Sequence, residues 1–335
     1  MTTDAQRVHD EAIVIDAVCP LLFEPKHLEL YRRGGATAVA PTAGGMDNAE
    51  NTMRALGRWL RRIRSGADLA LVRRAADVAI AKHDNRLGIV LHFQGTDPIE
   101  DSLDLIDAYK GLGVGIIQLT YNIKNRVGDG CEERTDAGLS RFGLDVIKRM
   151  NEARVIVDCS HTGYRTTMEA IEASTRPAVF SHAGCFSVHP SPRNIKDDQI
   201  KAVAAAGGLV GAVGFPAFVS AAPRPTLDEF IHHIEHTVNL VGIDHVALGI
   251  DYFTGQHPIV DDATAMAQYR QLVGSGRWSP KAYPPPPFHY PAGIETPEGL
   301  PNLTRRLVEL GWKIADIHKV LGANWVRVYR EVWGE

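Results

Sequence analysis

The stretch VIVDCSHTGYRTTMEAIEASTRPAVFSHA, residues 155–183, decides the fold. It begins with the apolar run 155–159 and ends with a second apolar run, 178–181. Between them, residues 166–173 carry apolar side chains at three- and four-residue spacing, the pattern of an amphipathic helix. Continuous apolar strands fit a parallel sheet that is buried on both faces. A strand, a helix and a second strand in this order therefore predict a parallel α/β architecture.

The same alternation extends along the chain in both directions. Further apolar runs that we interpret as strands lie at 13–18, 37–41, 69–72, 87–93, 114–120, 208–213 and 245–250. Helical spacing recurs at 101–110, 140–153, 197–206 and 227–241. No G-x-G-x-x-G motif follows the first strand, which disfavours an open doubly wound sheet. We therefore expect a (β/α)8 TIM-type barrel.

The strand candidates are one more than a (β/α)8 barrel needs, and we expect run 69–72 to be the edge or irregular one. A Pro-rich interruption, 283–287, precedes a C-terminal helical tail that we expect to cap the outside of the barrel. Its predicted helices are 300–309, 314–321 and 325–333. Because α/β barrels of this length are routinely one unit, residues 1–335 are expected to form a single domain.

Composition and charge narrow the classes of function. Of 335 residues, 44% are hydrophobic and 23% are charged, which is enough apolar material for a large core. The formal net charge of -4 lacks the basic surplus that nucleic-acid binding requires. The N-terminus has no signal-peptide pattern, and no run approaches the roughly 20 apolar residues of a membrane span. We expect a cytoplasmic protein with free thiols and with neither nucleic acid nor membrane as partner.

Polar side chains at the C-terminal ends of the strands are the candidate functional residues, because barrels carry their active sites there. They are Asp16, Cys19, Gln94, Tyr121, Asn122, Asp158, His161, His182 and Asp251. Two histidines and a carboxylate suit zinc and similar ions, so His161, His182 and Asp251 predict a three-point metal site. Arg193 follows the His182 strand, where its guanidinium can bind a substrate carboxylate.

Each of these residues also has a purely structural interpretation. His161 and His182 can be hydrogen-bonded histidines of the core, and Asp251 can cap a helix. Arg193 can form a surface salt bridge, and Cys19 can be a small buried hydrophobe instead of a thiolate ligand or nucleophile. The Ser-His pattern directly after two hydrophobic strands favours the functional interpretation of the histidine pair.

Several motifs together give the chain a family resemblance. They are LTYN (119–122), GDGC (128–131), GLSRFG (138–143), VDCSH (157–161), FSHA (180–183), RN (193–194), LGIDYF (248–253) and GANWVRV (322–328). With them the chain resembles the membrane dipeptidase (renal dipeptidase) family of the amidohydrolase superfamily, whose members hydrolyse dipeptides with two zinc ions bridged by a glutamate. The resemblance implies that His161 and His182 hold the second metal. It also implies that Arg193 binds the substrate carboxylate and that Asp251 handles the proton and orients the metal-bound water.

The chain departs from the family pattern at the metal site. Val18 and Pro20 stand where the resemblance places a His-x-Asp pair for the first metal, and Gln94 replaces the bridging glutamate. Tyr121 stands where the family has a histidine that polarises the substrate carbonyl. Loss of these ligands removes the negative charge that holds two divalent cations near each other. We therefore expect one divalent metal ion at most, zinc with iron or manganese as alternatives.

The expected function is hydrolysis of a dipeptide-like amide bond in a small carboxylate-bearing substrate. His161 and His182 are the expected metal ligands, and the candidates that complete the shell are water, Asp251, Cys19 and the Gln94 carbonyl. Asp251 and Tyr121 are the expected catalytic groups, as general base and as hydrogen-bond donor to an oxyanion. The expected substrate-binding residues are Arg193, Asn122 and Gln94.

Two other functions stay open at this point. One is a lyase or isomerase on the same scaffold, in which Asp251, Tyr121 or Cys19 moves a proton. The other is a catalytically inactive homologue that binds a small molecule. Robust turnover of dipeptides would exclude the lyase or isomerase, and the retained His161, His182 and Asp251 argue against an inactive homologue. The family resemblance alone implies a homodimer.

Overall fold

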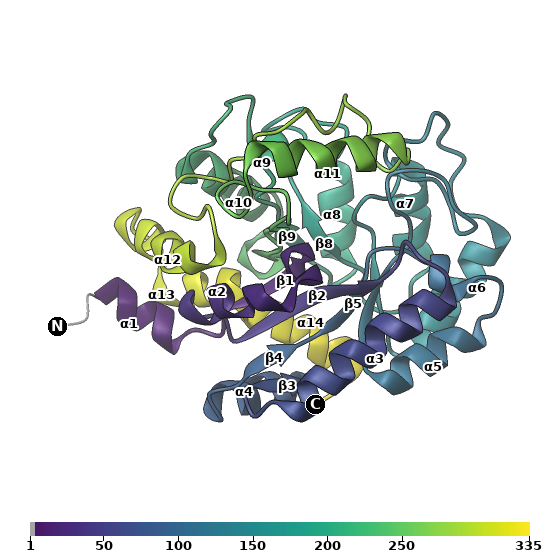
Figure 1. The fold of residues 1–335 in the computed structure, drawn as a ribbon, viewed down its shortest axis with the longest axis horizontal. Coiled ribbons are helices and arrows are strands. Elements are labelled where there is room, and N and C mark those ends of the chain that lie inside the picture. The colour runs from purple at the N-terminus through teal and green to yellow at the C-terminus, as the bar shows by residue number, and fades with distance from the viewer. Residues whose placement is uncertain (1–3) are drawn as a thin grey trace.

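Parallel strands alternate with helices along most of the chain, and the helices surround the strands (Figure 1). The computed structural model describes residues 4–335. One sheet has the order β3-β4-β2-β5-β6-β7, with β1 paired to β2, and a second has the order β10-β9-β8. The strands are β1 (Ile15–Cys19), β2 (Ala38–Gly44), β3 (Leu69–Leu71), β4 (Leu87–Ile89), β5 (Leu91–Phe93), β6 (Val114–Gln118), β7 (Ile156–Asp158), β8 (Phe180–Ala183), β9 (Val210–Ala212) and β10 (Val246–Leu248).

All ladders are parallel, as predicted. The α-helices are α1 (Asp4–Glu11), α2 (Leu28–Arg33), α3 (Ala49–Ser65), α4 (Ala75–His83), α5 (Asp104–Leu112), α6 (Arg141–Glu152), α7 (Tyr164–Ala173), α8 (Asp197–Ala205), α9 (Pro216–Val219), α10 (Leu227–Val241), α11 (Asp262–Gly274), α12 (Leu300–Glu309), α13 (Ile314–His318) and α14 (Asn324–Trp333). Shorter helical turns are η1 (Pro20–Phe23), η2 (Pro25–His27), η3 (Asp97–Ile99), η4 (Ile243–His245), η5 (Pro297–Gly299) and η6 (Lys319–Ala323).

The predicted strands and helices are present with small shifts of their ends. Helix α10 has the predicted bounds because a capping box starts it: the Thr226 hydroxyl accepts from Glu229 N at 3.2 Å, and the Glu229 carboxylate accepts from Thr226 N at 2.7 Å. Strand β3 pairs only with β4, which confirms the predicted edge strand. The single strand predicted at 87–93 is instead two strands, because β2 pairs first with β4 and then with β5 across a register shift.

The C-terminal tail is not confined to the outside, and the prediction of an external cap is wrong for α14. Its buried side chains Trp325, Tyr329 and Trp333 belong to a hydrophobic cluster with residues from strands of both sheets. The Trp325 indole donates to the Leu248 carbonyl at 2.9 Å. A Cβ on Gly115 would lie 2.5 Å from the Trp333 ring, so only glycine fits there. The tail is therefore part of the core that supports the strands.

The two sheets meet at two places. On one side, a single parallel bridge joins Asp158 to Val179. On the other, the Asp16 carboxylate in β1 accepts a hydrogen bond from Ile250 N, just after β10, at 2.8 Å.

No helix of residues 4–335 is both long and apolar enough to cross a lipid bilayer. The four cysteines are free thiols.

Asp16 makes a testable contribution to the pH dependence of stability. Burial raises the pKa of Asp16 to about 7, although the hydrogen bond from Ile250 N acts to lower it. Between about pH 4 and pH 7, Asp16 therefore keeps its proton in the folded state but has released it in the unfolded state, where the pKa of an aspartate is about 3.9. This term stabilises the fold below pH 4 and is lost as the pH rises through 7. We expect Asp16→Asn, which mimics the protonated form, to remove it.

Chemical denaturation at pH 5 and pH 8 measures the effect. The loss of stability between these values should be about 2 to 3 kcal/mol smaller in Asp16→Asn than in the wild type. Asp10→Asn, on exposed α1, is the control and should keep the wild-type difference. Equal pH dependence in the wild type and Asp16→Asn would contradict the assignment.

Candidate active site

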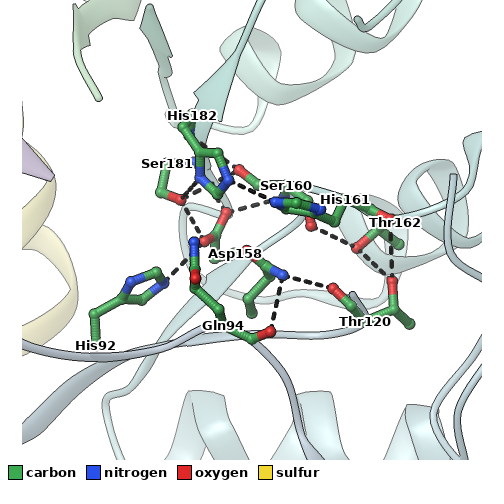
Figure 2. A network of polar contacts seen from close by, with 10 residues as sticks. His92, Gln94, Thr120, Asp158, Ser160, His161, Thr162, Ser181 and His182 are labelled. Carbon is green, nitrogen blue, oxygen red and sulfur yellow. Dashed lines mark hydrogen bonds and ion pairs between the residues drawn. The ribbon is translucent and has the colours of Figure 1, made fainter. Parts of the chain in front are cut away.

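The site begins where β7 and β8 end, with side chains from two consecutive Ser-His sequences (Figure 2). His161 adopts a left-handed backbone conformation, with φ of 61°, directly after the turn that follows β7. Such a conformation is costly for a residue other than glycine and is common at functional sites. His182 lies within β8. The two Nε2 atoms face each other at 2.8 Å.

Asp158 is the buried centre of the hydrogen-bond network behind this pair (Figure 2). Its Oδ1 accepts from Ser160 N at 3.0 Å and from Ser181 N at 2.9 Å. Its Oδ2 accepts from the Ser181 hydroxyl at 2.5 Å and from His92 Nε2 at 3.2 Å. Burial acts to raise the pKa of Asp158, but the hydrogen bond from His92 and the other donors hold this pKa well below its ordinary value. Asp158 is therefore an anion, and it accepts every hydrogen bond offered.

The hydrogen bonds also fix which nitrogen of each imidazole carries the proton. Because the Ser181 hydroxyl donates to Asp158, it must accept from His182 Nδ1, at 2.8 Å. The Asn122 side chain donates a hydrogen bond from Nδ2 to the Arg277 backbone carbonyl, which fixes the orientation of its amide. Its Oδ1 therefore faces His161 Nδ1 and accepts a hydrogen bond from it at 2.6 Å. Burial, followed by the charge of Arg193, holds the pKa of both histidines well below the ordinary value. Both rings are thus neutral, with a proton on Nδ1 and a lone pair on Nε2.

Arg193 lies beside the histidine pair and is almost fully buried. Its Nε donates to the Tyr283 hydroxyl at 3.1 Å, and its guanidinium lies over the Phe218 ring at 5.1 Å. Its Nη2 has no hydrogen-bond partner within residues 4–335. Arg193 and His161 line one cavity of about 240 Å³. The alternative interpretation of Arg193, a surface salt bridge, is not realised within residues 4–335, and the guanidinium has a free donor for a ligand.

Tyr121 stacks on the His161 ring, with ring centroids 4.2 Å apart. Its hydroxyl accepts from the Trp278 indole at 2.9 Å, which leaves the Tyr121 proton free to be donated. Burial raises the pKa of Tyr121 well above its ordinary range, so the phenol keeps this proton at neutral pH. Asn122 differs, because both ends of its amide already make hydrogen bonds. The structure thus gives Asn122 the geometry of a residue that orients His161.

Asp251 follows β10 in a left-handed backbone conformation, with φ of 63°. Burial raises its pKa to about 8, with the charge of Arg193 opposing this rise and Asp16 adding to it. Its carboxylate makes no hydrogen bond within the described part of the chain, and its backbone carbonyl accepts from the Tyr290 hydroxyl. It is not the N-cap of a helix, because α11 begins later and is capped by Asp261. Asp251 can therefore hold and release a proton near neutral pH.

The remaining predicted ligands do not join the histidine pair. The Cys19 thiol is buried and donates to the Asp16 carbonyl at 3.4 Å, and burial raises its pKa well above the ordinary value. The backbone carbonyl of Gln94 accepts from the Gln118 side-chain amide at 3.1 Å. The side-chain amide of Gln94 makes no hydrogen bond within residues 4–335. In the same described residues, no three His, Cys, Asp or Glu side chains are placed to hold a metal ion. The predicted three-point set with Asp251 or Cys19 is thus not assembled.

Sequence reasoning did not find the segment that covers Arg193 and Tyr121. Residues 277–290, of which only 283–287 were singled out as a Pro-rich interruption before the tail, contribute Trp278, Tyr283 and Tyr290 to the site. Trp278 and Tyr283 stack in parallel, with ring centroids 4.2 Å apart. The aromatic residues among the prolines were the available signal, since tyrosine and tryptophan combine apolar area with a polar group.

Comparisons with known proteins agree with the motifs. An uncharacterized protein in the pqqA 5′ region of Klebsiella pneumoniae is 29% identical over 279 residues, which are 80% of this chain and 91% of that relative. An uncharacterized dipeptidase of Schizosaccharomyces pombe is 30% identical over 250 residues, 73% of this chain, and the match spans about half (53%) of that relative's length. The crystal structure of an amidohydrolase from Pseudomonas aeruginosa has a TM-score of 0.91 at 32% identity, and the alignment covers 99% of this chain and 100% of that one.

The sequence profile described as Membrane dipeptidase (Peptidase family M19) matches residues 2–275. This match covers most of the chain and confirms the family resemblance predicted from the motifs. The chain therefore belongs to the membrane dipeptidase family, peptidase family M19, and is a dipeptidase-like hydrolase.

Proposed function

We propose that this protein is a metal-dependent hydrolase of small, carboxylate-bearing dipeptide-like substrates, and that it uses at most one divalent ion held by His161 and His182. The observation that carries the proposal is the pair of Nε2 lone pairs that face each other at 2.8 Å. Two lone pairs at this distance repel each other unless a cation lies between them. Each Nδ1–H already has an oxygen acceptor, which is the arrangement of metal-binding histidines.

The donor set fits one ion and does not fit two. His161 and His182 would hold one zinc ion through their Nε2 atoms, which now lie 2.8 Å apart, after a small opening of the pair. At the first-metal position, Val18 and Pro20 are buried apolar residues with no side-chain ligand atom. Gln94 is neutral and cannot replace a bridging carboxylate. When bound, a single divalent ion would polarise the substrate carbonyl and acidify a water molecule.

The chain's own residues would do the rest of the chemistry. Arg193 would bind the substrate carboxylate through its unpaired Nη2. The Tyr121 hydroxyl, oriented by Trp278, would donate its proton to the oxygen on which charge develops. Asp251 would accept a proton from the attacking water and deliver it to the leaving amine, a task suited to a group that titrates near neutral pH. Gln94 is the proposed side chain for a further polar contact to the substrate.

We also infer that the two sheets complete one closed (β/α)8 barrel in a single domain of 335 residues. The bridge between Asp158 and Val179 and the hydrogen bond from Ile250 N to Asp16 support closure at the two seams. A single hydrophobic cluster takes residues from strands of both sheets, which is the arrangement of side chains around a common interior. A homodimer, a cytoplasmic location and the lack of a nucleic-acid partner stay predictions from the sequence.

Metal titration and dipeptide assays test the proposed function. Calorimetric titration of chelator-treated protein with Zn²⁺ or Mn²⁺ should give one ion per chain, and alanine dipeptides should be hydrolysed in proportion to metal bound. His161→Ala should abolish both tight binding and turnover. His83→Ala, an exposed histidine on α4, is the control and should change neither. Two ions per chain, no ion at all, or full turnover in His161→Ala would contradict the proposal.

A further inference from the structure

We propose that this protein has a second binding site, for a small organic anion that carries a carboxylate or phosphate, in a cavity of about 570 Å³ beside the carboxyl end of β2. Side chains of α3 line it on one side and residues 42–44 of β2 on the other. It shares no lining residue with the cavity of Arg193 and His161. The inference does not depend on the proposed hydrolase function.

Four arginines line this cavity. Arg54, Arg58 and Arg62 stand one helical turn apart on α3, and Arg277 comes from the segment after α11. Like charges at i and i+4 destabilise a helix, so this row carries a cost that a bound anion would offset. Arginine is also the side chain best suited to carboxylate and phosphate, because its planar guanidinium donates two parallel hydrogen bonds.

The charge of this row is only partly neutralised by the protein. Arg54 pairs with Glu50 at 2.6 Å, and Arg62 makes two hydrogen bonds to Asp68, at 2.9 and 2.7 Å. Arg58 has neither an ion pair nor a hydrogen bond within residues 4–335. The Nη2 of Arg277 donates to the Met46 carbonyl at 2.9 Å, which fixes this guanidinium at the cavity. Asp47 also lines the cavity, but no ion pair joins it to an arginine within residues 4–335. Arg58, which is exposed, and Arg277 are therefore the cations with donors left for a ligand.

Two buried hydroxyl groups give an independent indication of a ligand. Thr42 is 5% exposed and Thr52 is 1% exposed, and both line the cavity. The Oγ1 atoms of both have no hydrogen-bond partner in the described chain. Buried polar groups are almost always hydrogen-bonded, so two unpaired hydroxyls on side chains that line one cavity favour an acceptor there, which each hydroxyl would reach by rotating toward the cavity. The oxygens of a carboxylate or phosphate are such acceptors, and they match the arginines in charge.

The cavity lies near the candidate active site but is separate from it. Thr42 in β2 pairs with His92 in β5, and the Gly44 carbonyl accepts from Gln94 N at 3.0 Å. The cavity thus lies one strand away from Gln94, on the side of the lost first-metal ligands.

Calorimetric titration with succinate and with inorganic phosphate, each against chloride at equal ionic strength, tests this site. We expect saturable binding of at least one anion. Arg58→Gln should weaken it roughly tenfold, as expected for one charge-assisted hydrogen bond. Thr42→Val, which keeps the shape of the side chain, should also weaken binding without lowering the melting temperature. Tighter binding of succinate would identify a carboxylate ligand, and tighter binding of phosphate a phosphorylated one.

Arg61→Gln is the matched control, because Arg61 is exposed on the same helix and does not line the cavity. Its affinity for the anion should equal that of the wild type. If neither anion binds, or if Arg58→Gln binds as tightly as Arg61→Gln, the proposed site does not exist. Binding that persists in Arg58→Gln but is lost in an Arg193→Gln variant would assign the anion to the candidate active site and would also overturn the inference.

Discussion

We expect Asp158→Asn to lower the free energy of unfolding by about 3 to 5 kcal/mol and to weaken metal binding about 10- to 100-fold. Asp158 accepts four hydrogen bonds, two of them from backbone amides. The side-chain amide of asparagine would place an N–H group opposite at least one of these donors, so at least one of the four hydrogen bonds would be lost. The Ser181 hydroxyl would then lose its acceptor and be free to donate to His182 Nδ1. That reversal would move the proton of His182 to Nε2, where it blocks the metal.

Denaturant unfolding and metal calorimetry separate the two effects of this substitution. Ser181→Ala removes the link between Asp158 and His182, together with the 3.2 Å contact between the Ser181 and Ser160 hydroxyls, and leaves the Asp158 carboxylate in place. Its metal affinity should therefore fall about tenfold while its stability falls by about 1 kcal/mol. Asp145→Asn, an exposed aspartate on α6, controls for the loss of a charge and should change neither quantity. Unchanged metal affinity in Ser181→Ala would show that the network is structural and does not set the state of His182.

The second large effect is expected for Arg193→Lys, which should raise KM for a dipeptide about 10- to 100-fold with little change in kcat. The guanidinium is held by Tyr283 and Phe218, and its unpaired Nη2 is the donor available to a carboxylate. Lysine keeps the charge but offers neither the planar fork nor the contact with the Phe218 ring. A contact that is the same in the ground state and the transition state affects KM alone.

Steady-state kinetics on a dipeptide and on its C-terminal amide measure this role. The wild type should prefer the free carboxylate by the same factor that Arg193→Lys loses, and both enzymes should treat the amide alike. Tyr283→Phe is the matched variant, because it leaves the aromatic packing in place and removes the hydroxyl that accepts from Arg193 Nε and from Asn122 Nδ2. If Arg193→Lys discriminates between the two substrates as well as the wild type, Arg193 is not the carboxylate anchor.

Much of the fold was predictable because its signals are local. An apolar run of five residues indicates a buried strand, and the Thr226 to Glu229 capping box marks the start of α10 wherever that helix packs. The division of residues 87–93 into β4 and β5 was not predictable, since it follows from the way β2 shifts its pairing. The burial of Trp325 and Trp333 was missed for a related reason: an amphipathic helix shows that it has an apolar face but not what this face covers.

For the site, the sequence by itself determined that His161, His182 and Arg193 lie close together, because strand ends of a parallel sheet meet at one edge whatever the loops do. The prediction that the first-metal ligands are missing came from the family resemblance and not from this geometry. Only the tertiary structure decided the protonation of His161 and His182, the cover that Trp278 and Tyr283 form, and the isolation of Cys19 from the pair. These features depend on hydrogen bonds between residues distant in the chain, such as Asn122 and Tyr283, 161 positions apart. Such contacts are set by the packing of whole elements, and no short pattern of residues encodes them.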